Sequence, residues 1–400
     1  MFENVKRSAI YVHFPFCLRK CPYCDFVSYD SSPVNRDEYI DSILLELGSL
    51  QKDIGVPLEA ASVYLGGGTP SLMTPRQVEK LLDGIKRHAP FPADAEITIE
   101  VNPATAGEAG MAAWRSMGIN RISLGIQSTD PKILVKLERV HTVEEGIMTY
   151  RFARRVGFFS VGIDLIFGVP GQSFESWKAD LLRAIELEPD HLSAYMLKAP
   201  QGWEPPCEEE LADMYTFTVD ELEAAGLFQY EVSNFARPGY ESRHNLTYWK
   251  MGEYIGLGVA AHSHMSWSNR PARSDSPHPL NKDPHQNNIF SIRWWNTPGP
   301  EDYINKINEK GNAISDYEYI DMEKSIYENL LLSLRLREGL DMGLKAFKSR
   351  KAIESVGAHL EEGGLASIEG SILKLTPRGL LLADEIAARI AASVSNGEGS

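Results

Sequence analysis

The sequence predicts an α/β fold: a partial (β/α)6 barrel, similar to a TIM barrel, with a small C-terminal helical domain resembling a winged helix. Two observations predict it. Six short apolar runs alternate with longer segments of 3.6-residue periodicity up to residue 195, and this alternation stops after residue 210. Repeated strand–helix units form a parallel sheet covered by helices. Since six units are too few to close an eight-stranded barrel, we expect a partial barrel or an open sheet.

The apolar runs are the expected strands. They cover residues 9–13, 62–65, 96–101, 121–124, 161–166 and 191–195. The segments between them are the expected helices, over 36–47, 75–87, 109–117, 143–156 and 174–187. Thr74 and Thr142 stand where helix N-caps are expected. Ligands gather at the carboxyl ends of parallel strands, so we expect the functional site at that edge.

The domain organisation follows from the change of pattern. Residues 1–300 are expected to form the core, with an exposed loop rich in Pro, Ser, Asn and Asp at 268–288 and a helix at 211–225. Residues 301–392 are expected to form the C-terminal domain, and 393–400 a loose tail. Within that domain we expect a helix at 323–337, a hairpin at 368–375 that turns at Gly370, and a last helix at 378–392.

Composition excludes several classes of protein. The 400-residue chain has a formal net charge of −15 and no long Lys/Arg run, so no nucleic-acid partner is expected. No apolar stretch reaches the length of a membrane span, and the N-terminus lacks the apolar region of a secretory signal. We therefore expect a cytoplasmic protein without an integral membrane segment, and peripheral association through partner proteins stays open.

Three of the four cysteines lie within eight positions, on the loop after the first expected strand. Cys17, Cys21 and Cys24 have the spacing C-x₃-C-x₂-C. Thiolates suit iron–sulfur clusters and zinc. With three local ligands, one iron of a four-iron cluster would lack a protein ligand, and an open metal position is where chemistry occurs. A structural zinc site, completed by Cys207 or a histidine, is the alternative.

The segment from Tyr11 to Cys24 resembles the signature of radical S-adenosylmethionine (SAM) proteins, in the branch of oxygen-independent coproporphyrinogen III oxidase. The resemblance implies a partial barrel of the radical SAM type, with a 4Fe–4S cluster on Cys17, Cys21 and Cys24. It also implies SAM, bound to the open iron through its amino and carboxylate groups. In that family, an electron from the cluster splits SAM into methionine and a 5′-deoxyadenosyl radical.

Several polar and glycine positions match the residues that surround SAM in this branch. By that resemblance the SAM-binding residues are Tyr11, Tyr23, Gly67, Gly68, Thr69, Glu100, Gln127, Arg139 and Asp164. Independently of it, glycines after a strand let backbone amides approach a ligand closely. A charge such as Asp164 within an apolar run is costly unless it is paired. The alternatives are an ordinary turn for the glycines, solvated charges for Glu100 and Arg139, and core packing for the tyrosines.

A second motif is His244-Asn245-Leu-Thr-Tyr248-Trp249. Imidazole is a common axial ligand of heme iron, and Tyr and Trp offer flat apolar faces to a macrocycle. From the residues alone, a hydrogen-bonded structural histidine is the alternative. The motif resembles that of the heme chaperone family, as do segments 231–236 and 256–258 with 261–263. The resemblance implies that His244, Asn245, Tyr248 and Trp249 bind heme, and that client hemoproteins, such as those of the respiratory chain, receive it.

Two departures count against coproporphyrinogen oxidation. Phe26 stands where the oxidase has a further cysteine, and only 16 residues precede Cys17, fewer than in the oxidase. Our leading hypothesis is therefore a heme chaperone that carries a 4Fe–4S cluster and SAM. The alternative is a catalytic radical SAM enzyme, either oxidase-like or a methyltransferase of the related class that uses two SAM molecules. Whether the protein is an enzyme is left open, as is a metal-binding fold without turnover.

Overall fold

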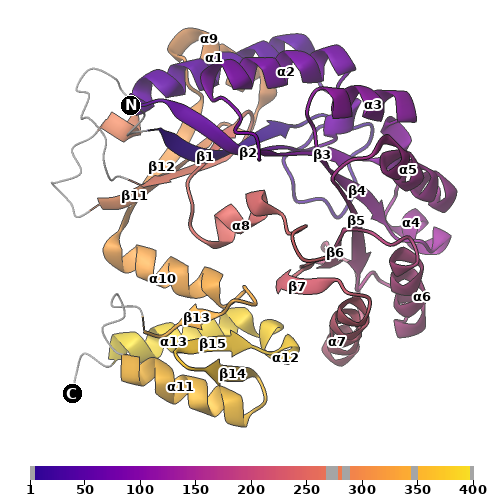
Figure 1. Ribbon diagram of the computed structural model, residues 1–400, viewed down its shortest axis with the longest axis vertical. Coiled ribbons are helices and arrows are strands. Elements are labelled where there is room, and N and C mark those ends of the chain that lie inside the picture. Colours follow the sequence, from indigo (N-terminus) through magenta and orange to yellow (C-terminus); the bar gives the residue numbers. More distant parts are fainter. Residues whose placement is uncertain (1–4, 267–277, 282–288, 344–349, 397–400) are drawn as a thin grey trace.

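The expected partial barrel is confirmed by the computed structural model, which describes residues 5–266, 278–281, 289–343 and 350–396. Six parallel strands lie side by side in chain order in one curved sheet (Figure 1). They are β1 (Lys6–Phe14), β2 (Leu58–Gly67), β3 (Glu96–Val101), β4 (Arg121–Gln127), β5 (Ser160–Phe167) and β6 (His191–Met196). All six begin or end within a few residues of the expected runs.

Helices cover the convex face of this sheet (Figure 1). They are α1 (Arg36–Ile54), α2 (Pro75–His88), α3 (Glu108–Ser116), α4 (Pro131–Lys136), α5 (Val143–Val156), α6 (Phe174–Ile185) and α7 (Glu208–Ala224). The bounds of α5 agree with the expected ones because both ends carry local signals. Thr142 and Glu145 form a capping box at its start, and Gly157 ends it with φ 79°.

The sheet continues beyond the six strands at both edges. β9 (Tyr254–Leu257) pairs in parallel with the free edge of β1. β10 (His262–Ser266), β11 (Ile289–Asn296) and β12 (Ile314–Asp321) then follow in antiparallel order. At the other edge, β8 (Asn234–Ala236) pairs with β6, and β7 (Phe228–Glu231) pairs with β8. The sequence analysis did not predict these strands, and the pairing of β9 with β1 joins segments far apart in the sequence.

Helix α8 (Arg243–Trp249) lies on the concave side of the sheet (Figure 1). The carboxylate of Glu96, at the start of β3, accepts hydrogen bonds from the backbone amides of Arg243 and His244, both at 3.0 Å. Ser242 caps the helix by accepting from the amide of Asn245. These bonds satisfy the first amides of a short helix and fix it to the interior of the partial barrel.

The C-terminal part contains a second, three-stranded sheet packed among helices (Figure 1). Helix α9 (Pro300–Lys310) instead lies beside α1, at the other end of the molecule. The elements of the C-terminal part are α10 (Met322–Ser333), β13 (Leu340–Asp341), α11 (Arg350–Glu362), β14 (Ala366–Glu369), β15 (Ile372–Leu375), α12 (Pro377–Leu380) and α13 (Ala383–Asn396). The expected hairpin is present and turns at Gly370, with φ 64°. The last expected helix is divided into α12 and α13, and α13 extends into the expected tail as far as Asn396. Since β12 belongs to the large sheet, we propose that the domain boundary follows β12 rather than residue 300.

The described part of the expected loop 268–288 differs from the expectation of an exposed segment. Residues 278–281 include a 3₁₀ turn, η3 (Pro279–Asn281), and the side chains of His278 and Leu280 are each only 4% exposed. The His278 ring meets Trp294 edge to face, with centroids 5.4 Å apart. Packing of His278 on β11, and of the 3₁₀ turn on α1, explains the burial. The rest of that loop lies outside the described residues.

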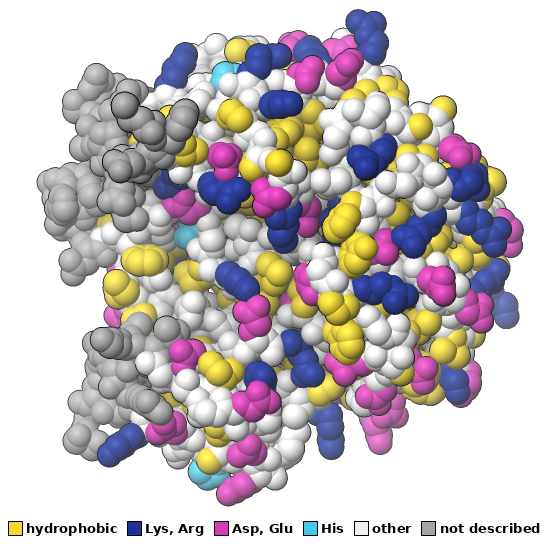
Figure 2. Space-filling view, in the orientation of Figure 1, with side chains coloured by type: hydrophobic (Ala, Val, Ile, Leu, Met, Phe, Trp, Pro, Cys, Tyr) yellow, Lys and Arg dark blue, Asp and Glu magenta, His cyan; other side chains and the backbone are white. Residues whose placement is uncertain are grey.

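Charge is mixed over the surface and no membrane helix is present. On the face shown in Figure 2, Lys and Arg side chains alternate with Asp and Glu, without a broad field of one sign. Among the described residues, no helix combines the length and apolar character needed to cross a bilayer.

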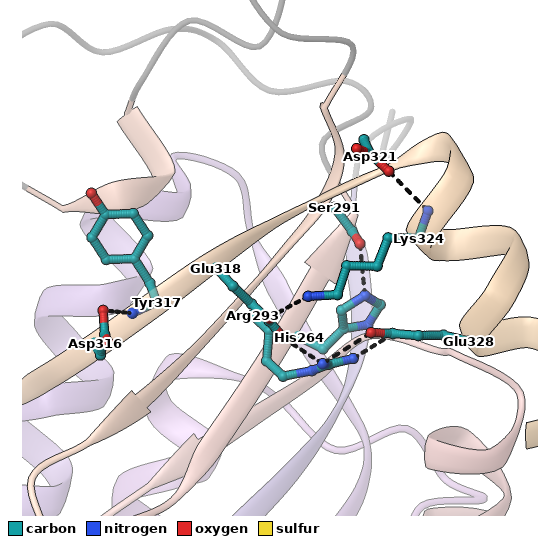
Figure 3. A network of polar contacts seen from close by, with 9 residues as sticks. All are labelled: His264, Ser291, Arg293, Asp316, Tyr317, Glu318, Asp321, Lys324 and Glu328. Atoms are coloured by element: carbon teal, nitrogen blue, oxygen red, sulfur yellow. Dashed lines mark hydrogen bonds and ion pairs between the residues drawn. The ribbon is translucent and has the colours of Figure 1, made fainter. Parts of the chain in front are cut away.

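A network of ion pairs joins the large sheet to α10 (Figure 3). The Arg293 guanidinium on β11 donates to Glu318 on β12 at 2.5 Å and to Glu328 on α10 at 2.6 Å. Lys324 also pairs with Glu318. The Arg293 and Glu328 side chains are only 25% and 15% exposed, so this pairing is screened less than an ordinary surface ion pair.

We expect Arg293→Met to lower the free energy of unfolding by about 1–3 kcal/mol, because two partly buried carboxylates lose their charged donor. Lys374→Met is the matched control, since its partner Glu369 is 66% exposed. We expect that change to cost less than about 1 kcal/mol. Chemical denaturation of both variants checks this, and equal losses would contradict it.

Candidate metal and cofactor site

The cysteine loop leaves the carboxyl end of β1 and is fixed by backbone hydrogen bonds at its base. The amide of Cys17 donates to the carbonyl of Tyr29 at 2.9 Å, and the amide of Tyr29 donates to Pro15 at 2.7 Å. A His13 ring nitrogen bonds the carbonyl of Val27 at 2.7 Å. The loop between these anchors therefore presents its thiols from a defined position beside the sheet.

A cavity of about 410 Å³ opens at the carboxyl ends of the strands, as the sequence predicts. All three cysteines of the motif line it, together with most of the expected SAM-binding residues. These are Tyr23, Gly67, Gly68, Thr69, Glu100, Gln127, Arg139 and Asp164. We call it the cysteine cavity. Residues from the loop and from β2 to β5 thus converge at one place.

The glycine run allows the end of β2 to pack against the cysteine loop. The amides of Gly68 and Thr69 donate to the carbonyls of Phe14 and Phe16, both at 2.8 Å. A Cβ on Gly68 would lie 2.8 Å from the backbone of Pro15, so no larger residue fits there. Close backbone approach was expected from these glycines. The partner that the structure shows is the loop itself.

Two carboxylates face the cysteine cavity. Glu100 accepts from the Tyr64 hydroxyl at 3.0 Å and from the amide of Gly67 at 3.1 Å. Asp164 accepts from the Ser123 hydroxyl at 2.8 Å through Oδ2, whereas its buried Oδ1 has no partner among the described residues. Burial raises the pKa of Glu100 to about 7 and also raises the pKa of Asp164. An acceptor without a partner among the described residues and two buried carboxylates with raised pKa values indicate a place for a donor-bearing ligand.

Arg139 brings a positive charge to the cysteine loop. Its guanidinium donates to the Cys21 sulfur and to the Tyr23 hydroxyl, both at 3.4 Å, and to the carbonyl of Gly125 at 3.2 Å. Its Nε is buried without a partner among the described residues. Gln127, the last residue of β4, has φ 69°, which is uncommon for a residue other than glycine. Within the part of the chain that the structure describes, Arg139 thus has an unpaired donor in the cavity, and Gln127 has a strained backbone there.

A second cavity of about 480 Å³ adjoins the first. We call it the aromatic cavity. Its lining includes Tyr11, His13, Tyr64, Tyr195, His244, Asn245, Tyr248, Tyr254, Ala261 and His262. The two cavities share five residues, namely Asp25, Phe26, Tyr64, Glu100 and Tyr195. The expected heme motif is thus placed next to the expected cluster site.

His244 is deeply buried in the wall of the aromatic cavity. Its side chain is 1% exposed, Nδ1 bonds the Ser62 hydroxyl at 2.9 Å, and Nε2 bonds the Tyr248 hydroxyl at 2.7 Å. The ring stacks on Tyr64, with centroids 5.0 Å apart. Burial lowers the pKa of His244 to about 3, so the imidazole is neutral.

Two expected site residues lie apart from their groups. Tyr11 lies in the aromatic cavity rather than the cysteine cavity, and its hydroxyl bonds His13 Nδ1 at 3.0 Å. Trp249 lines neither cavity, and its ring lies 6.0 Å from the Arg335 guanidinium at the end of α10. Consecutive residues of a helix face different directions, which explains why Tyr248 and Trp249 separate.

Sequence reasoning missed several residues of the cysteine cavity. They include Tyr64, Asn102, Ser123 and Tyr195. A signal was present: Ser123, Gly125 and Gln127 alternate along β4, and residues two apart share a face of a strand. Applying this period of two to each strand end would have found Ser123 and, beside Gly66, Tyr64.

The arrangement of the three thiols differs from a site for a single ion. Among the described residues, no three His, Cys, Asp or Glu side chains lie close enough to hold one metal ion. Cys207 is exposed at the start of α7 and does not line the cysteine cavity. Cys207 therefore does not complete a zinc site with these three thiols, whereas a cluster takes one thiolate on each of several irons.

Comparisons with known proteins agree with this geometry. The model of the Radical SAM superfamily matches residues 11–184. The heme chaperone HemW of Mycobacterium tuberculosis is 33% identical over 94% of this chain and 93% of its own length. The HemW protein of Bacillus subtilis is 32% identical over 94% and 97%, respectively. This chain belongs to the HemW family of radical SAM proteins.

A further relative and a solved structure are also similar to this chain. The HemW protein of Escherichia coli is 39% identical over 65% of this chain and 70% of its own. The solved structure of coproporphyrinogen III oxidase (HemN) from Escherichia coli has a TM-score of 0.77 at 23% identity, over 96% of this chain and 90% of that one. This likeness confirms the radical SAM type of fold.

A radical SAM domain implies a 4Fe–4S cluster and SAM, and the cysteine cavity fits both. Cys17, Cys21 and Cys24 would hold the cluster. Asp164 Oδ1 and Arg139 Nε, which lack partners among the described residues, are suited to a ligand with both donors and a carboxylate, as SAM has. When bound, the cluster and SAM supply one-electron chemistry at this end of the sheet.

We expect Cys21→Ala to lose most of the cluster, because the remaining two thiolates cannot hold it. Iron and acid-labile sulfide per chain, measured after anaerobic reconstitution, check this. Cys207→Ala is the matched control and should keep the iron content of the unchanged protein. Equal iron in both variants would contradict the assignment.

We expect Glu100 to stabilise the protein without ligands less at pH 8 than at pH 6. Glu100 has a pKa of about 7 when folded, above its ordinary value of 4.5, so its contribution to stability is present at low pH and is lost as the pH rises through 7. Glu46 and Glu231 have the same shift and add to the effect.

The measurement is the thermal midpoint at both pH values for the unchanged protein and for Glu100→Gln. Buried histidines with lowered pKa values, such as His141, change the stability in the opposite direction and are common to both proteins, so the comparison isolates Glu100. Relative to the unchanged protein, the midpoint of the variant should rise between pH 6 and pH 8, because the Glu100 carboxyl is gone. An equal change of midpoint in both proteins would count against the raised pKa of Glu100.

Proposed function

We propose that this protein is a heme chaperone. It binds heme in the aromatic cavity and delivers it to hemoproteins such as respiratory cytochromes, with the 4Fe–4S cluster and SAM held in the adjoining cavity in support. We place this activity in the cytoplasm, with association at a membrane only through clients. The relatives in the HemW family carry the name of heme chaperone, and that name motivates the proposal.

The observation that carries the proposal is the lining of the aromatic cavity. Its volume of about 480 Å³ falls within the range of about 300–1,000 Å³ typical of small-molecule sites. Tyr11, Tyr248 and Tyr254 offer aromatic faces, which suit a flat macrocycle. Asn245 and Tyr248 of the expected heme motif stand in the wall, and His244 lies behind them.

The shared wall supports a joint role for the two cavities. Tyr64 and Glu100 line both, and they are joined by the 3.0 Å hydrogen bond described above. A heme in the aromatic cavity would therefore lie against residues that also contact a ligand of the cysteine cavity. Such contact through shared residues would allow heme binding to be coupled to the state of the cluster site.

Phe26 supports the chaperone over the oxidase. Its side chain is 58% exposed and lines both cavities, in the place where the oxidase has a further cysteine. A phenyl ring cannot transfer a proton or bind a metal, so it offers packing area rather than chemistry. An exposed aromatic side chain beside an aromatic cavity suits contact with an apolar ligand or partner.

Titration of the anaerobically reconstituted protein with hemin, followed by Soret absorbance, tests the proposal. We expect saturable binding of one heme per chain and its transfer to an apocytochrome. Asn245→Trp should weaken binding by about tenfold or more, because the indole occupies the cavity. Lys250→Trp, at the exposed end of the same helix, is the matched control and should bind heme normally.

Two results would overturn the proposal. One is weak, unsaturable heme binding that Asn245→Trp leaves unchanged. The other is substantial formation of protoporphyrinogen during anaerobic incubation with SAM, a reductant and coproporphyrinogen III, which would favour the oxidase. Methyl transfer from SAM to an added porphyrin would favour the methyltransferase.

A further inference from the structure

We propose that His262, rather than His244, supplies the axial ligand to the heme iron, and that His244 is a positioning residue. The inference rests on the proposed function, since it concerns the heme bound in the aromatic cavity. It depends on how the two imidazoles differ in access and bonding, because both residues line that cavity.

His244 has no ring nitrogen available. Both nitrogens are bonded, to Ser62 and Tyr248, and the ring is 1% exposed behind Tyr64. Coordination of iron would require breaking the 2.7 Å bond to Tyr248 and moving that side chain aside. A buried hydroxyl left without its partner costs about 1–3 kcal/mol, so the arrangement favours keeping the bond. His244 therefore fixes Tyr248 in the cavity wall.

His262 has the opposite properties. It is the first residue of β10, its side chain is exposed, and it reaches the mouth of the aromatic cavity. Within the described ranges, neither of its ring nitrogens has a hydrogen-bond partner. Its ring stacks on Trp295, with centroids 5.4 Å apart and planes at 22°. Partial burial lowers its pKa, which favours the neutral imidazole that binds metals.

His264, two residues along the same strand, shows what a structural histidine looks like here (Figure 3). Its Nε2 bonds the Ser291 hydroxyl at 2.9 Å, its Nδ1 bonds the carbonyl of Gly252 at 3.0 Å, and it is 4% exposed. His262 and His264 share a face of β10, yet only His264 has its bonding capacity filled. Of these two histidines, only His262, at the start of β10, has ring nitrogens without a partner among the described residues.

The turn before His262 is held rigidly, as a ligand position requires. The amide of Gly258 donates to the buried carboxylate of Glu46 at 2.9 Å, and the amide of Val259 donates to the Tyr39 hydroxyl at 2.9 Å. The amide of Ala260 donates to Thr297 at 3.0 Å. Two amides of the turn are therefore bonded to side chains of α1 and a third to the segment after β11, which preorganises the imidazole that follows.

The position also suits a protein that must release its heme. A ligand at the cavity mouth can be replaced by a ligand of an acceptor protein without opening the core. A ligand at the depth of His244 would be reached only after Tyr248 and Tyr64 had moved. Access of this kind distinguishes a transfer site from a permanent heme pocket.

The test measures iron ligation in the hemin complex of the full-length protein, by magnetic circular dichroism and resonance Raman spectroscopy. We expect an imidazole signature that His262→Ala removes, with heme affinity reduced by about tenfold or more. Free imidazole should restore the signature to this variant. His262→Cys should replace it with the signature of a thiolate ligand.

His244→Gln, which keeps a hydrogen-bonding side chain in the core, should retain the imidazole signature. His359→Ala, an exposed histidine on α11, is the matched control. Far-ultraviolet circular dichroism and the thermal midpoint establish that each variant is folded.

The outcomes separate the two proposals. If His262→Ala keeps the imidazole signature, or if folded His244→Gln loses it, His262 is not the ligand although heme binding stands. A wild-type complex with saturable binding but no imidazole signature would also overturn the inference alone. Absence of saturable binding to the unchanged protein would overturn the heme chaperone proposal itself.

Discussion

Strand β1 forms parallel pairs along both of its edges, with β2 on one side and β9 on the other. Tyr11 is the midpoint of this arrangement, since it is opposite Tyr64 on β2 and Gly256 on β9. Because both neighbours run in the same direction as β1, their carboxyl ends meet where the cysteine loop begins. The β2 side supplies the glycine run and the cysteine cavity. The β9 side supplies the turn that leads to His262 and the aromatic cavity. One strand thus fixes the relative position of both candidate sites.

The interior between these elements depends on buried polar groups that are almost fully paired. Glu46 accepts from the amide of Gly258, from the Asn296 amide group and from the Tyr303 hydroxyl, and so joins α1 to three later segments. Burial raises its pKa to about 7 despite these bonds. A carboxylate in this position is costly, but its bonds have fixed directions that apolar packing lacks. Among the described residues, the buried atoms without a partner include Asp164 Oδ1, Arg139 Nε and Asn102 Oδ1, whose residues line the cysteine cavity. Others, such as Asn296 Oδ1, lie elsewhere in the interior.

The sequence predicted those features that local chemistry determines. Strand runs, the N-cap at Thr142 and the cysteine spacing depend on a few neighbouring residues, and Asp164 stands out because a charge is unusual within an apolar run. Glu100 was predicted only through the family resemblance. Pairing between distant segments was not predictable in this way. β9 joins the sheet by pairing with β1, more than 200 residues earlier in the chain, and β10 to β12 then follow as consecutive antiparallel strands. The stacking of His262 on Trp295 exists only once β10 and β11 pair. The direction of Trp249 likewise depends on where α8 lies relative to Arg335.

Tyr64 and Glu100 are hydrogen-bonded to each other and line both cavities. Ligand binding in one cavity can therefore be linked to ligand binding in the other. A ligand that displaces the Tyr64 ring or changes the ionisation of Glu100 from one side alters the surface met by a ligand on the other. Any such effect must be reciprocal: the factor by which the first ligand changes the affinity of the second equals the factor by which the second changes that of the first. Through this shared wall, occupancy of either cavity can change the affinity of the other for its ligand, without motion of the surrounding barrel.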